Sequence, residues 1–209
     1  MRVEYLFVRS LEDYLEKQIQ PILKNPQSLK LGNKRFTNIK LIPREVLGAF
    51  IICAVIRFIS EQNWTLARDP MVGDGMVLCM DPSRKGEGAF LEQVYVPRMN
   101  EKSPAGIDEI VRRIEIEIKK KHSKGKVYYE NRNLVIFLDI KGLLNYQKVK
   151  KIIDDLENGF DSYWLFAPYD KLYSYLVFLL KAGRDQPAAY RVEIREDFRG
   201  WEVKRLGRL

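Results

Sequence analysis

The chain has 209 residues, of which 46% are hydrophobic and 31% are charged; it therefore holds enough apolar material for one soluble core and is not a disordered polymer. Its 36 lysines and arginines against 28 aspartates and glutamates give a formal net charge of +8, which favours a polyanionic partner, with nucleic acid the first candidate. Two cysteines exclude a disulfide scaffold and a four-cysteine zinc site, and the single histidine excludes a histidine-rich metal site. Any catalysis is therefore expected to depend on carboxylates.

The first element in the chain is expected to be helical. Apolar residues recur every three to five positions from Leu6 to Ile22 and predict an amphipathic helix that ends near Pro21. Charged residues interrupt this stretch, so we do not interpret it as a signal peptide. A reducing cytoplasm fits the low cysteine content.

A basic segment follows this helix. Between Pro21 and Arg44 the chain carries six basic residues and no acidic one, which makes it a candidate for contact with a phosphate backbone. The nucleic-acid-binding residues expected here are Lys34, Arg35 and Lys40. Residues 1–43, the helix and the basic segment, are expected to precede a single α/β domain formed by residues 44–209.

The next element is expected to be a buried helix. Pro43 followed by Glu45 is typical of a first helical turn, and an apolar run predicts that the helix continues to about Gln62. The most hydrophobic window, Val46–Ile59, has 14 residues and is interrupted by Arg57, whereas a bilayer span needs about 20. We therefore expect a core helix and no membrane contact.

The rest of the chain alternates between strand and helix patterns. Three runs rich in β-branched and aromatic residues predict a meander of strands at Trp64–Arg68, Met76–Met80 and Phe90–Val96. The later elements are expected as a helix at Ile107–Lys121, a buried strand at Leu134–Asp139, a helix at Asn145–Leu156, a buried strand at Ser162–Ala167, a helix at Lys171–Lys181 and an edge strand at Tyr190–Glu196. This order predicts an α/β protein with a mixed sheet, antiparallel at one end and parallel at the other.

Two carboxylates are singled out by their expected positions. Asp74 lies at the entrance of the second strand and Glu92 lies inside the third, so hairpin pairing can bring them together. Converging carboxylates can hold Mg²⁺, whose bound water can attack a phosphodiester. Asp74 is also consistent with an ordinary Asp-Gly turn, whereas Glu92 interrupts an apolar strand and must have a partner if that strand is central.

The order of these elements resembles the PD-(D/E)XK, or restriction-endonuclease-like, nuclease superfamily over roughly residues 44–167. The resemblance implies a mixed β-sheet with an α-β-β-β-α-β core flanked by helices. It further implies that Asp74 and Glu92 bind the metal, Mg²⁺ or Mn²⁺, and that Glu45, on the helix that begins at Pro43, completes the catalytic site. The implied substrate is nucleic acid, in the first place DNA.

One position departs from the superfamily pattern. The lysine that follows the glutamate by two positions is replaced by Val94, and Gln93 points to the opposite face of the strand. In some members the lysine lies on the following helix, where Arg112 or Arg113 is the candidate here; arginine clamps phosphate but transfers protons poorly. Two interpretations stay open: an active nuclease, or a catalytically inactive nuclease-like module that binds nucleic acid or a protein partner.

The remaining candidates are weighed against simpler interpretations. Arg98, just beyond the Glu92 strand, is expected to lie near the site and to bind nucleic acid. Asp69 before Pro70 is interpreted as a turn residue, and the lysine run at 119–126 as a complement to the dipole of a helix C-terminus. A small-molecule α/β enzyme has little support, because the sequence has no dinucleotide fingerprint, Walker loop or nucleophile elbow. A homodimer or larger complex is compatible with these expectations.

Overall fold

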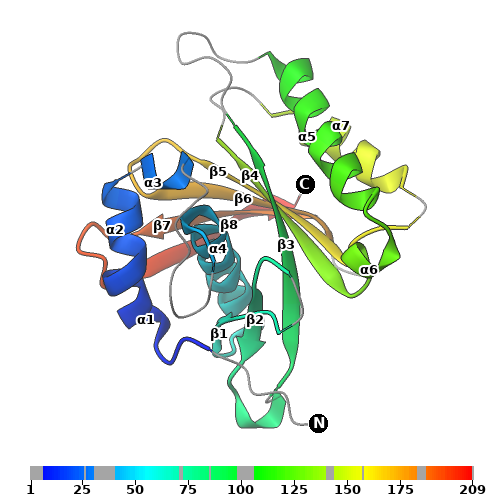
Figure 1. The fold of residues 1–209 in the computed structure, drawn as a ribbon. Coiled ribbons are helices and arrows are strands. Elements are labelled where there is room, and N and C mark those ends of the chain that lie inside the picture. Colours follow the sequence, from blue (N-terminus) through cyan, green and yellow to red (C-terminus); the bar gives the residue numbers. More distant parts are fainter. Residues whose placement is uncertain are drawn as a thin grey trace.

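The computed structural model describes residues 7–25, 27–30, 41–70, 73–84, 86–97, 106–139, 144–156, 158–182 and 187–208. These residues form an α/β protein around an eight-stranded mixed sheet that curls into a half-barrel (Figure 1). The strands are β1 (Trp64–Ala67), β2 (Met76–Cys79), β3 (Gly88–Val96), β4 (Arg132–Leu138), β5 (Ser162–Pro168), β6 (Ser174–Ala182), β7 (Ala188–Ile194) and β8 (Trp201–Arg208).

The helices precede the sheet and connect its parallel strands. They are α1 (Leu11–Tyr14), the π-helical turn η1 (Leu15–Ile19), α2 (Gln20–Lys24), α3 (Gln27–Lys30), α4 (Pro43–Ser60), α5 (Ile107–His122), α6 (Lys126–Tyr129) and α7 (Tyr146–Asp154), with a short 3₁₀ turn at Pro82–Arg84. Most predicted elements up to β5 are confirmed within a few residues. No helix in the described ranges is both long and apolar enough to cross a bilayer.

The strands lie across the sheet in sequence order, from β1 to β8. β1, β2 and β3 pair antiparallel, β3, β4 and β5 pair parallel, and β5 to β8 pair antiparallel again. The parallel part is thus the centre of the sheet. The prediction that it lies at one end is wrong. The reason is that the chain returns directly from β5 into β6 without a crossover helix.

The helix predicted at Lys171–Lys181 is wrong, because most of this segment is strand β6. Its apolar residues fit helical spacing, but a short apolar run does not distinguish a buried strand from a buried helix. Tyr175, Val177 and Phe178 suit a strand that pairs on both sides. The predicted edge strand, now β7, is also internal, because β8 lies beyond it.

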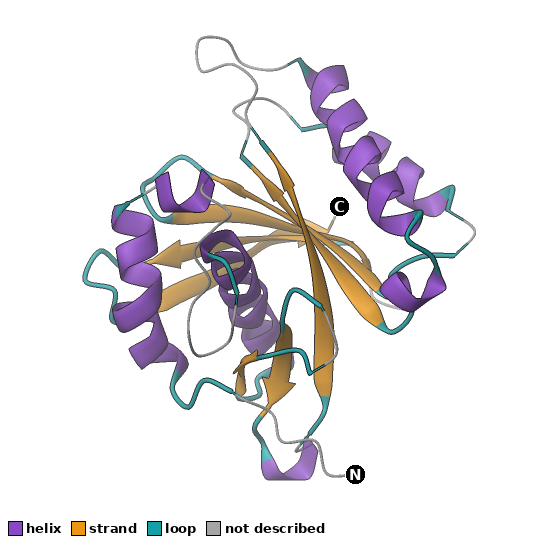
Figure 2. Cartoon of the chain, in the orientation of Figure 1, coloured by secondary structure: helices purple, strands orange, loops and turns teal. Residues whose placement is uncertain are grey.

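Helices cover both faces of the sheet (Figure 2). Helix α4 lies inside the curl, where it contacts β1 to β4, β7 and β8, and most of its residues are buried, as the apolar pattern predicts. Helices α5 and α7 pack on the opposite face of the central strands through a second apolar cluster. The middle of β3 therefore has α4 on one face and α5 on the other.

The N-terminal helix continues past Pro21 to Lys24, beyond its predicted end. A proline within a helix lacks an N–H donor and crowds the carbonyl four residues earlier. Here the preceding turn is π-helical, with the Gln20 N–H donating to the carbonyl of Leu15, and this wider turn accommodates the proline. These helices share one apolar cluster with α4; the domain boundary at residue 43 stays a prediction.

Candidate functional site

The site begins where the chain enters β2. The N–H of Asp74 donates to the carbonyl of Leu91 at 3.1 Å, and the N–H of Leu91 donates to the carbonyl of Gly75 at 2.9 Å. Gly75 has φ 117°, a backbone conformation that favours glycine. These bonds extend the pairing of β2 with β3 backwards, so that Asp74 lies beside Glu92, as hairpin pairing predicts.

The side chain that joins these two carboxylates is Lys121, in the last turn of α5. Its Nζ donates to Oδ2 of Asp74 at 3.0 Å and to Oε2 of Glu92 at 2.7 Å. The Lys121 side chain is only 14% exposed. The two carboxylate oxygens thus converge on one cation, which comes from a helix 29 positions along the chain from Glu92.

Lys121 is the functional candidate that the sequence analysis missed, because it lies within a run of solvated lysines. A pattern was available to find it. Ile114 and Ile118 are buried on α5, and position 121 continues the same helical stripe three residues later. A lysine that extends an apolar stripe indicates a buried ion pair in place of a solvated charge.

The second oxygen of Glu92 faces Arg132 at the start of β4. Nη1 of Arg132 lies 3.4 Å from Oε1 of Glu92 and 2.7 Å from Oδ2 of Asp69. Oδ2 of Asp69 also accepts the N–H of Gly73 at 2.9 Å. Asp69, which was interpreted as a turn residue, is therefore also the carboxylate partner of a buried arginine.

Gln93 connects the site to α4 on the other face of β3. Its side-chain amide donates to the carbonyls of Glu45 at 2.8 Å and Asp74 at 3.2 Å, and its backbone N–H donates to Oδ2 of Asp74 at 2.8 Å. The Glu45 carboxylate accepts the N–H of Ile42 at 3.0 Å. Glu45 is thus placed beside the cluster by the first turn of α4, without joining the ion pairs of Lys121.

The pKa shifts follow from burial and charge. Burial raises the pKa of Glu45 to about 7; the Ile42 N–H opposes this rise and the Asp74 charge adds to it. Burial also raises the pKa of Glu92, against the opposing effects of Lys121 and Arg132. Burial lowers the pKa of Lys121, but the Asp74 and Glu92 carboxylates outweigh it and the net pKa is raised. Lys121 is therefore an ammonium at neutral pH.

The cluster has more acidic than basic groups. Among the described residues, its carboxyl groups belong to Asp69, Asp74 and Glu92, and its cations are Lys121 and Arg132. Excess negative charge in a partly buried site is relieved by an additional cation or by protonation. This charge balance suits the binding of a metal ion.

The donor set fits a cation that keeps much of its water. Within the described ranges, no three histidine, cysteine, aspartate or glutamate side chains gather into a group that could hold a metal ion. Asp74 and Glu92 supply two converging carboxylates. Mg²⁺ is commonly bound by one or two carboxylates together with water and substrate phosphates, so these two residues fit Mg²⁺ or Mn²⁺ and do not form an all-protein metal cage.

The other residues predicted to bind nucleic acid do not contact these carboxylates where the structure describes them. Arg112 pairs with Glu109 at 2.8 Å, and Arg113 pairs with Glu109 at 3.4 Å and donates to the carbonyl of Pro97. Their role in nucleic-acid binding stays a prediction. Four further predicted residues lie outside the described residues: Lys34, Arg35, Lys40 and Arg98.

Comparisons of the chain with protein-family models, with characterised proteins and with solved structures find no match. Function must therefore be inferred from the chemistry of the site itself.

Proposed function

We propose that the protein is a metal-dependent nuclease that hydrolyses DNA phosphodiester bonds. The observation that carries this proposal is the position of Lys121 Nζ, within hydrogen-bonding distance of both Asp74 and Glu92. Val94 stands where the PD-(D/E)XK superfamily has its lysine. Lys121 of α5 brings an ammonium group to the same two carboxylates. This position of Lys121 favours an active site over an inactive one.

The order of elements supports the same proposal. Helix α4, strands β1 to β3, helix α5 and strand β4 follow one another along the chain, and β3 pairs antiparallel with β2 and parallel with β4. This is the α-β-β-β-α-β order that the resemblance implies. In our proposal these elements form a restriction-endonuclease-like core, and β5 to β8 extend its sheet.

In this proposal Asp74 and Glu92 would hold Mg²⁺ or Mn²⁺, which would polarise the phosphate and lower the pKa of a bound water. The raised pKa of Lys121 keeps it protonated. Two of its three N–H groups bond Asp74 and Glu92, so the third can donate a hydrogen bond to a non-bridging phosphate oxygen. Glu45 accepts the proton that the water loses, since a pKa of about 7 suits a general base at neutral pH.

One observation favours a second candidate function. Glu92 is only 3% exposed, and both of its oxygens already face a cation. Such an internally paired cluster is compatible with a catalytically inactive module that binds nucleic acid or a protein partner. Metal binding separates the two candidates, because the inactive module does not require it.

The test combines plasmid cleavage with metal titration. We expect Asp74→Asn and Glu92→Gln to reduce Mg²⁺-dependent cleavage by about 100-fold or more, since each removes a charge that binds the metal. Lys121→Gln should also cleave slowly, yet it should bind Mn²⁺ more tightly than the wild type in calorimetry, because the ammonium that competes for the carboxylates is gone. Lys120→Gln is the matched control, since Lys120 is exposed and pairs with Glu117.

Two results would contradict the proposal. Cleavage at the wild-type rate in both carboxylate variants would identify a contaminating nuclease. An absence of Mn²⁺ binding in both the wild type and Lys121→Gln would favour the inactive module.

A further inference from the structure

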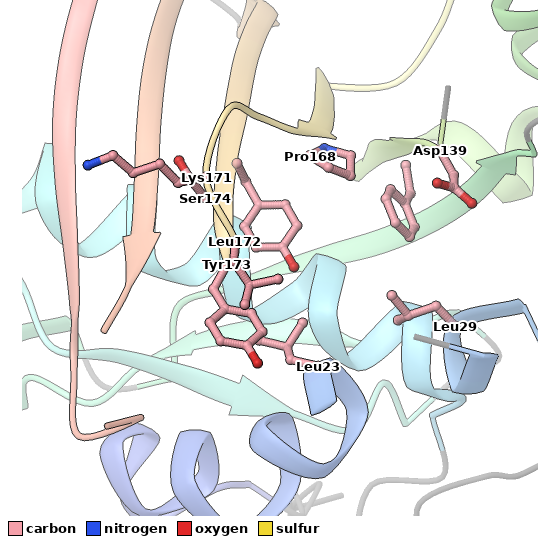
Figure 3. Close-up of a pocket in the computed structure, with 10 residues that line it drawn as sticks. Leu23, Leu29, Asp139, Pro168, Lys171, Leu172, Tyr173 and Ser174 are labelled. Atoms are coloured by element: carbon pink, nitrogen blue, oxygen red, sulfur yellow. The ribbon is translucent and has the colours of Figure 1, made fainter. Parts of the chain in front are cut away.

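A cavity of about 230 Å³ lies at the carboxyl ends of the parallel strands β4 and β5 (Figure 3). Figure 3 shows Asp139 and Leu29 on one side of it and Tyr173 and Lys171 on the other. Glu92 pairs with Leu134 in β4. Asp139 lies five residues after Leu134, about 16 Å further along the extended chain. The cavity is therefore separate from the carboxylate cluster. Ligands of α/β proteins commonly bind beyond the carboxyl ends of the strands.

The cavity is lined by a tyrosine whose hydroxyl is available to a ligand. Tyr175 lines the cavity and is 5% exposed, yet its hydroxyl forms no hydrogen bond with any described residue. A phenol hydroxyl can donate one hydrogen bond and accept others, so the Tyr175 hydroxyl is available to a ligand in the cavity. Ser174 lines the cavity too, and its hydroxyl is buried without a partner, but adjacent strand residues point to opposite faces of the sheet, so the proposal does not use it.

A carboxylate supplies the second polar group. Oδ2 of Asp139 accepts the hydroxyl of Tyr95 at 2.7 Å, which fixes the orientation of the carboxylate. An ionised carboxylate has about four lone-pair positions and donates no hydrogen bond. Asp139 can therefore accept N–H groups from a ligand while it keeps its bond to Tyr95.

The walls of the cavity indicate a flat ligand. Phe137, Tyr173 and Tyr175 contribute aromatic rings, which pack well against a planar ring. The ligand must place N–H donors towards Asp139 and an acceptor towards the Tyr175 hydroxyl. We propose that this cavity binds a nucleobase that presents N–H donors beside a carbonyl oxygen, as guanine does.

Calorimetric titration of the full chain with guanosine, inosine and adenosine tests the donor pattern. Guanosine should bind most tightly, inosine more weakly because it lacks the 2-amino group, and adenosine at least about tenfold more weakly than guanosine because it lacks the ring N–H and the carbonyl oxygen. A short single-stranded oligonucleotide with one dG presents the same base edge. Comparing it with guanosine distinguishes an unpaired base in nucleic acid from a free nucleoside.

Two conservative substitutions test the roles of the Tyr175 hydroxyl and the Asp139 carboxylate. Tyr175→Phe should weaken guanosine binding by up to about tenfold, the range of one hydrogen bond. Asp139→Asn should weaken it by about tenfold or more, because it removes charge-assisted bonds while it keeps an acceptor for Tyr95. Tyr14→Phe is the control, because it removes a tyrosine hydroxyl that has no hydrogen-bond partner from a residue that does not line the cavity.

The proposal is overturned if none of the nucleosides binds at millimolar concentration, or if Tyr175→Phe and Tyr14→Phe have the same effect on guanosine binding. Binding that is equally strong for adenosine and guanosine would also overturn it. Guanosine binding should persist in Asp74→Asn, so this inference and the proposed nuclease activity fail independently.

Discussion

Glu92 illustrates how much a single buried charge demands of its surroundings. Its carboxylate lies between Lys121 and Arg132, and the pairing offsets part of the cost of removing the charge from water. Removal of either cation would leave an uncompensated buried charge. Arg132 is itself held by Asp69, so the orientation of Glu92 depends on residues that do not contact the proposed metal.

Glu45 leads to a prediction about pH. Its pKa is raised from 4.5 in the unfolded chain to about 7 in the folded protein, so the folded state binds more protons between these pH values. The free energy of unfolding should therefore fall as pH rises from about 4.5 to 7. Glu45→Gln keeps an acceptor for the Ile42 N–H and should remove this part of the decline. Above pH 7 its free energy of unfolding should exceed that of the wild type by about 1–2 kcal/mol.

Urea unfolding of the wild type and Glu45→Gln at pH 5 and pH 8 measures this difference. The two proteins should have similar stabilities at pH 5 and differ at pH 8. Identical pH dependence in both proteins would mean that Glu45 is not buried in the folded state as described.

Residue-scale prediction succeeded where the information was local. The apolar neighbours of Glu92 predicted that it has a partner, and the meander predicted its proximity to Asp74. The helical stripe of α5 could have marked Lys121 as buried, but no local pattern pairs Lys121 or Arg132 with Glu92, because they lie 29 and 40 positions away. Only the packing of α5 and β4 on β3 brings them to the same carboxylate.

At the scale of elements, the contact between α4 and β3 depends on a glycine. A Cβ atom at Gly48 would overlap Oε1 of Gln93 and lie 3.3 Å from Cε1 of Phe166. The absence of a side chain lets the helix approach the strand closely enough for Gln93 to bond the carbonyl of Glu45.

Gly48→Ala should therefore destabilise the protein by about 1–2 kcal/mol, although alanine is the better helix former by up to about 1 kcal/mol. It should also slow cleavage, because the displaced Gln93 amide no longer bonds Glu45 and Asp74. Gly207→Ala is the matched control, since a Cβ atom there meets nothing within 4 Å. Chemical denaturation measures both variants, and a stabilised Gly48→Ala would contradict the close approach.

Elements were predicted well where one periodicity dominated. Ile110, Ile114 and Ile118 mark one face of α5 at helical spacing, and this helix agrees with its prediction. Strand β6 was mistaken for a helix because its apolar residues fit both patterns. Strand β8 was missed because its side chains are exposed or half-buried where the structure describes them. An exposed strand has little apolar alternation from which it could be predicted.

The whole molecule carries a net charge of +8, and this leads to a prediction about salt. If the protein contacts several phosphates, the logarithm of its affinity for DNA should fall linearly with the logarithm of salt concentration, by about 0.9 per phosphate contacted. Arg112→Gln should reduce the magnitude of this slope by about 0.9. Lys204→Gln, which changes a strand five positions from β3 in the sheet, should leave it unchanged.

Fluorescence anisotropy of a labelled duplex at several salt concentrations provides the measurement. An affinity for DNA that does not change with salt concentration, or no binding at low salt, would contradict binding of the protein to the phosphate backbone. It would leave the cavity near Asp139 unaffected, because that site is proposed to recognise a base and not a phosphate backbone.

The half-barrel also leaves two sheet borders that must not recruit neighbouring molecules. At β1 the chain closes its own border, because the Val8 N–H donates to the carbonyl of Leu66 at 2.8 Å. At β8 the exposed side chains include the charged Glu202, Lys204 and Arg205, and charged side chains on an edge strand oppose pairing with a strand of a second copy. Crowded solutions of the protein should accordingly resist growth of intermolecular β-structure, and self-association, if it occurs, should use another surface.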